Sequence, residues 1–75
     1  MQYKNFGKFI REKRKALCPK LSLNRFAIDN DLEPAILSRV ETQQQDVKLK
    51  VIEKIAKGFG MKVSELLAEY ESQIF

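Results

Sequence analysis

The side chains with the clearest chemical capacity lie in a short stretch near the middle of the chain, residues 34–41. Leu37 and Val40 stand three positions apart, so in a helix they share one apolar face. The opposite face would carry residues that have nothing to bury: Pro34, Ala35, Ser38 and Arg39. A short helix that is held by its back and free at its front can present side chains to the DNA major groove.

Arg39 is the strongest candidate for a base contact. A guanidinium can donate two parallel hydrogen bonds to O6 and N7 of guanine, the commonest base-specific contact. Apolar neighbours could only touch groups such as a thymine methyl, whereas Glu33 could accept from cytosine N4 but would repel nearby phosphates. The alternative is a solvated arginine on a surface helix, and the surrounding pattern favours the base contact. We therefore expect base contacts from Arg39, Ala35, Pro34, Ser38 and Glu33.

Catalytic and metal chemistry find little support in the sequence. The chain has no histidine, no glycine-rich phosphate loop and no Cys/His cluster. Asp29, Asp31 and Glu33 alternate like the start of a calcium loop. Such a loop would need glycine where Pro34 stands and glutamate where Val40 stands. We expect no enzyme, no metal and no cofactor.

Helices must position the residues around Arg39. Apolar spacing predicts helices over residues 5–17, 22–30, 34–42, 48–58 and 63–71. Pro19 stops the first helix, and Ser22 is a good N-cap for the second. Pro34 suits a first helical position, because its missing N–H would have no partner there. Gly60 fits the left-handed position that ends a helix. The fold class is therefore all-α.

Size and composition are typical of one small folded domain, residues 1–75. Hydrophobic residues make up 44% and charged residues 32%. No apolar run approaches the roughly 20 residues that span a bilayer, and the first residues lack a signal-peptide pattern. The single cysteine, Cys18, cannot form an internal disulfide. We expect a cytoplasmic protein that does not associate with membranes.

Positive charge is concentrated in the N-terminal third. Residues 1–25 carry eight Lys or Arg and one Glu, a net charge of +7, whereas residues 26–75 carry six Lys or Arg and nine acids, a net charge of −3. A basic N-terminal third is compatible with a polyanionic partner. The alternative is a solvated helix that is merely rich in lysine, and from charge alone this alternative is favoured.

The pattern resembles the Cro and phage-repressor family of helix-turn-helix DNA-binding domains. In that family a small residue precedes a turn, an aliphatic residue and an aliphatic-Ser-x-aliphatic-Glu run; here these are Ala27, Leu32 and residues 37–41. Residues 9–15, 55–60 and 63–67 resemble the family's first, fourth and fifth helices. The resemblance implies a compact five-helix fold in which helices 22–30 and 34–42 form the helix-turn-helix.

Two positions depart from the family pattern. The turn usually holds glycine where Asp31 stands, and Asp is among the non-glycine residues that best tolerate a positive φ. The second helix usually carries glutamine where Leu23 stands, so one polar contact to DNA is lost.

The resemblance implies phosphate contacts from two rims of the surface. One rim is the start of helix 22–30, where backbone N–H groups and the helix dipole favour an anion. The other is the loop after helix 34–42, where a plain solvated loop is an equal alternative for the glutamines. The candidates are Ser22, Asn24, Arg25, Thr42, Gln43, Gln44 and Lys48.

The resemblance also implies a structural ion pair and a dimer. In the family an Arg late in the first helix pairs with the Glu that ends the third, and here these are Arg14 and Glu41. Such a pair would fix the angle of the recognition helix. We expect a homodimer whose surface includes Tyr70, Ile74 and Phe75.

The implied function is sequence-specific binding of double-stranded DNA by a repressor-like transcriptional regulator on a palindromic operator. The alternative is a protein-interaction module with the same fold, such as an antitoxin, that binds a protein partner and touches DNA weakly. Leu23, Pro34 and Ala35 support this alternative, because they make the presumed groove face poor in hydrogen-bond donors.

Overall fold

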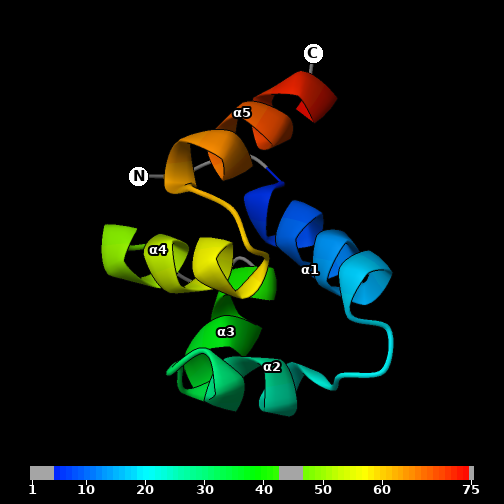
Figure 1. Ribbon diagram of the computed structural model, residues 1–75, viewed down its shortest axis with the longest axis vertical. Coiled ribbons are helices and arrows are strands. Elements are labelled where there is room, and N and C mark those ends of the chain that lie inside the picture. The colour runs from blue at the N-terminus through cyan, green and yellow to red at the C-terminus, as the bar shows by residue number, and fades with distance from the viewer. Residues whose placement is uncertain (1–4, 43–46, 75) are drawn as a thin grey trace.

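The computed structural model describes residues 5–42 and 47–74, and within them the chain forms five helices and no strand. The helices are α1 (Phe6–Leu17), α2 (Leu23–Asp29), α3 (Pro34–Glu41), α4 (Leu49–Gly58) and α5 (Val63–Ile74). Figure 1 shows α5 at one end of the molecule and α2 with α3 at the other, with α1 running between them. The all-α, five-helix prediction is confirmed.

Local sequence explains three of the helix ends. The Ser22 hydroxyl accepts a hydrogen bond from the Arg25 backbone N–H at 3.1 Å and so caps α2. Pro34 occupies the first turn of α3, as predicted. Gly60 has a φ of +70°, which fits its predicted left-handed position after α4. α5 extends three residues beyond the predicted end, because neither proline nor glycine interrupts it.

The core lies where all five helices converge. Its largest fully buried side chains are Phe6, Phe26, Ile10, Leu37, Ile52, Ile55, Leu66 and Val40. Among the described residues no buried side-chain nitrogen or oxygen atom lacks a hydrogen-bond partner. A membrane-spanning helix is not found within the same residues.

Tyr70 belongs to this core, which corrects its predicted place on a dimer surface. Its side chain is only 4% exposed. The ring lies edge-on to Phe6, with centroids 5.2 Å apart, and 5.5 Å from the ring of Phe9. A ring packed against α1 has no surface left for a second subunit. The Ile74 side chain and Phe75, predicted for the same surface, lie outside the described residues.

The turn between α2 and α3 has the geometry that its residues favour. Asp31 adopts a left-handed conformation with a φ of 59°, as predicted for a residue type that tolerates it. The Leu32 N–H donates to the Ala27 carbonyl at 2.8 Å, and both side chains are buried. Ala27 is small enough to let α2 and α3 approach closely. These two helices form the predicted helix-turn-helix.

Candidate nucleic-acid interface

α3 has one face closed by the rest of the molecule and one face open to solvent. Leu37 and Val40 are 0% and 1% exposed on the closed face. Ala35, Ser38 and Arg39 are exposed on the opposite face. Within the described residues the Arg39 guanidinium makes no ion pair or side-chain hydrogen bond. The guanidinium can therefore donate to a ligand that has two adjacent hydrogen-bond acceptors.

Pro34 and Glu33 flank this open face at the start of α3. Pro34 is partly buried, so only part of its ring could touch a ligand. Glu33 is exposed at the N-cap, and its carboxylate makes no capping hydrogen bond. The start of α3 thus combines one apolar edge with one free negative charge, and this combination would disfavour close approach of a phosphate.

An ion pair from α1 closes the other end of α3. Arg14 Nε donates to Glu41 Oε2 at 2.7 Å, and Arg14 Nη2 donates to Glu41 Oε1 at 3.0 Å. The two side chains are 7% and 3% exposed. The hydrogen bonds to Glu41 raise the pKa of Arg14 against the opposing effect of burial. Arg14 therefore stays a cation, and its two hydrogen bonds to Glu41 fix α3 against α1 at two points.

The start of α2 carries three of the predicted phosphate contacts. Ser22, Asn24 and Arg25 are exposed there, whereas Leu23 is partly buried and packs against the core. Arg25 Nε lies 3.2 Å from Asp29 Oδ1, one turn later on the same helix. Both side chains are largely solvated, so this pair would hold Arg25 only weakly away from a phosphate.

Two of the phosphate contacts predicted for the second rim, Thr42 and Lys48, lie among the described residues. The Thr42 hydroxyl donates to the Ser38 carbonyl at 2.9 Å, so it caps α3 and is already engaged. Lys48 is exposed at the N-cap of α4. Gln43 and Gln44 lie outside the described residues. Of the predicted contacts on this rim, Lys48 is the one described cation.

Known proteins provide one informative comparison. The chain is 34% identical over 68 residues to Control protein C.MunI from Mycoplasma sp., and the match covers 91% of this chain and 90% of that protein. The chain belongs to the family of this control protein. No protein-family model matches the chain, and neither does any solved structure. The relative is by name a control protein, which supports a related helix-turn-helix regulator.

One contact beside the turn between α2 and α3 could not be predicted from the sequence. Lys54 Nζ on α4 donates to the Asp31 carbonyl oxygen at 2.9 Å and lies 3.7 Å from Asp31 Oδ2. The two residues are 23 positions apart. A solvated lysine on the polar side of a predicted helix is the ordinary expectation, so sequence reasoning assigned Lys54 no role.

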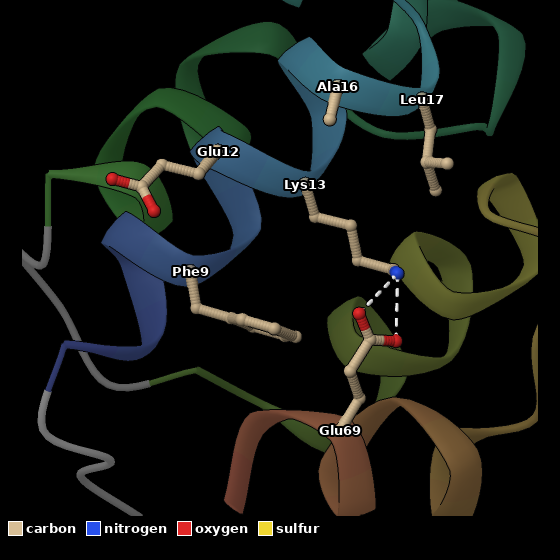
Figure 2. A pocket seen from close by; sticks show the side chains of 6 residues that line it. All are labelled: Phe9, Glu12, Lys13, Ala16, Leu17 and Glu69. Carbon is tan, nitrogen blue, oxygen red and sulfur yellow. Dashed lines mark hydrogen bonds and ion pairs between the residues drawn. The ribbon is translucent and has the colours of Figure 1, made fainter. Parts of the chain in front are cut away.

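A pocket also lies between α1 and α5 of this protein. Its volume is about 310 Å³, and its lining residues are Phe9, Glu12, Lys13, Ala16, Leu17 and Glu69. Figure 2 shows Lys13 reaching from α1 to Glu69 on α5 across this pocket. Lys13 Nζ lies 2.8 Å from both Glu69 carboxylate oxygens. Because Lys13 and Glu69 pair with each other, the Glu12 carboxylate is the charged group of the lining that has no partner among the described residues.

Proposed function

We propose that the chain is a sequence-specific, DNA-binding transcriptional regulator of the repressor type that acts in the cytoplasm. α3 would lie in the major groove as the recognition helix. The observation that carries this proposal is the open face of α3, on which Arg39 is exposed and unpaired among the described residues. Membership in the family of a control protein supports a regulatory role.

The residues of the open face would make different kinds of contact with the bases. Arg39 would donate two hydrogen bonds to O6 and N7 of one guanine in each half-site. Ala35 and the exposed edge of Pro34 would make apolar contacts, and Ser38 would hydrogen-bond a neighbouring base. Glu33 would accept from cytosine N4, because a phosphate at the same place would be repelled.

Residues at the two rims would bind phosphates and thereby fix the docking register. Lys48 would supply a charged contact, whereas the exposed Ser22 and Asn24 would supply neutral ones. Arg25 could join them by leaving Asp29, since that ion pair is solvated. These contacts carry affinity without sequence preference.

We further propose that residues 1–75 act as one domain and bind as a homodimer. A twofold dimer would place one recognition helix in each of two half-sites, with centres about 34–36 Å apart, one turn of DNA. Because Tyr70 is buried, the dimer contact must use other residues. The proposed operator is accordingly palindromic.

Selection of bound sequences from a random pool of double-stranded DNA tests this proposal. The expected result is an enriched palindrome whose half-sites are one helical turn apart. Binding without an enriched sequence, or no binding at low salt, would contradict it. Such a result would favour the protein-interaction module with the same fold.

A salt titration provides the matching control. A DNA-binding protein loses affinity steeply with salt, with a slope near −0.9 for each phosphate that it neutralises. A flat response would show that phosphate contacts do not drive the association.

A further inference from the structure

α4 contacts the turn of the helix-turn-helix at two consecutive residues. Lys54 donates to the Asp31 carbonyl, as described above, and Gly58 lies against Asn30. A Cβ on Gly58 would lie 2.7 Å from Asn30 Nδ2, so the backbone of α4 approaches that residue closely. Lys54 and Gly58 are four positions apart and therefore share one face of α4. This face supports the turn from the side.

The turn is the place where support matters most. Asp31 holds a left-handed conformation that only glycine adopts freely. The Lys54 ammonium stabilises it through the carbonyl oxygen, because a hydrogen bond from a charged donor is stronger than a neutral one. The Asp31 carboxylate contributes less, since its side chain is 98% exposed and lies 3.7 Å away.

Cations from two other helices therefore bind the chain near each end of α3. At its C-terminal end Arg14 of α1 binds Glu41, and just before its N-terminal end Lys54 of α4 binds Asp31. The first contact is buried and the second is solvated. With the second contact removed, α3 would remain attached through Glu41 but its start would lose one constraint on its direction.

We propose that Lys54 is a positioning residue for recognition of DNA by α3. It fixes the turn that leads into the recognition helix and so holds the open face in register with the base edges, without touching DNA itself. This inference rests on the proposed function. It adds a role for a residue on α4 that lies outside both the recognition helix and its phosphate-binding rims.

Three variants test the inference on the operator that the parent selects. Lys54→Met keeps the length of the side chain and removes the charge, Lys54→Arg keeps the charge, and Lys57→Met removes a nearby exposed charge on the same helix. We expect Lys54→Met to weaken operator binding about threefold to tenfold. Lys54→Arg should restore most of this loss, and Lys57→Met should bind like the parent.

The salt dependence separates positioning from direct contact. The inference predicts the same salt slope for Lys54→Met and the parent, because no phosphate contact is lost. A slope that becomes shallower by about 0.9, the value for one phosphate, would overturn it and make Lys54 a phosphate ligand. Unchanged affinity of Lys54→Met, measured where circular dichroism shows all variants to be folded, would also overturn it.

Amide hydrogen exchange of the free protein gives a readout that does not need DNA. The Leu32 N–H closes the turn by donating to Ala27, so Lys54→Met should exchange this proton faster than Lys57→Met does. Equal exchange rates would overturn the inference. If the parent binds no DNA, the proposed function fails, while the exchange experiment still decides whether Lys54 holds the turn.

Discussion

On α3, the face that carries Leu37, Val40 and Glu41 is closed by the rest of the molecule, whereas the face that carries Ser38 and Arg39 is open to solvent. Every buried side-chain nitrogen or oxygen atom has a hydrogen-bond partner among the described residues, while the Arg39 guanidinium has none there. Substitutions on the closed face should therefore change stability. Substitutions on the open face should change DNA recognition and leave stability unaltered.

Glu41→Ala removes a buried charged partner from the closed face and should cause the largest loss of folding free energy. It leaves Arg14 buried and without its partner, which typically costs about 3–5 kcal/mol of folding free energy. This is a large fraction of the stability of a small domain. Denaturant unfolding monitored by circular dichroism measures the loss, with Glu53→Ala as the exposed control on α4. Equal unfolding midpoints for Glu41→Ala and the parent would contradict the structural role of the pair.

Gly58→Ala tests whether the contact between α4 and the turn before α3 is as tightly packed as the closed face. The new methyl group would lie 2.7 Å from both Asn30 Nδ2 and Phe26 Cζ, and Phe26 is 1% exposed. We expect a loss of about 1–3 kcal/mol from overpacking, although alanine in a helix otherwise gains up to about 1 kcal/mol over glycine. Thermal unfolding measures the balance. A variant more stable than the parent would show that α4 and α2 can separate at no cost.

Lys48→Ala probes the rim of the open face. It should weaken binding to every DNA sequence alike and make the salt slope shallower by about 0.9 if Lys48 neutralises one phosphate. Fluorescence anisotropy with operator and random duplexes measures both quantities, with Lys57→Ala as the control. A loss confined to the operator would instead assign Lys48 to base recognition.

Lys13→Met should have the smallest effect, although Lys13 is the sequence neighbour of Arg14. Its partner Glu69 is 36% exposed, whereas Glu41 is 3% exposed. Lys13 is 12% exposed, so the pair is partly buried, but removing Lys13 leaves the Glu69 carboxylate able to contact water. The expected loss of unfolding free energy is therefore about 1 kcal/mol, well below that of Glu41→Ala. A loss as large as that of Glu41→Ala would show that α1 depends equally on both of its ion pairs.

Local chemistry in the sequence was sufficient to predict much of the fold. Ser22 and Pro34 marked helix starts and Gly60 marked a helix end, and the structure agrees with each of these. The left-handed turn at Asp31 was expected from the family resemblance, and the structure agrees with it as well. These features depend on neighbours within a few positions, so a single sequence contains the relevant information. Likewise, the spacing of Leu37 and its neighbours predicted which face of α3 is closed.

Contacts between distant segments were harder to predict. Helical spacing placed Tyr70 on an apolar face but could not show that Phe6 and Phe9, more than 60 positions earlier, cover that face. Leu17 shares the spacing of the α1 core residues, yet it is 54% exposed because it lies at the end of the helix. The contact of Lys54 with Asp31 depends on tertiary geometry alone. The Arg14–Glu41 pair was expected only from the family resemblance.

The most direct test of the open face is the affinity of Arg39→Ala for the selected operator and for its single-base-pair variants. We expect a loss of about 1–3 kcal/mol on the operator, relaxed preference at one base pair in each half-site, and a melting temperature equal to that of the parent. Unchanged affinity and unchanged base preference would contradict the assignment of α3 as the recognition helix.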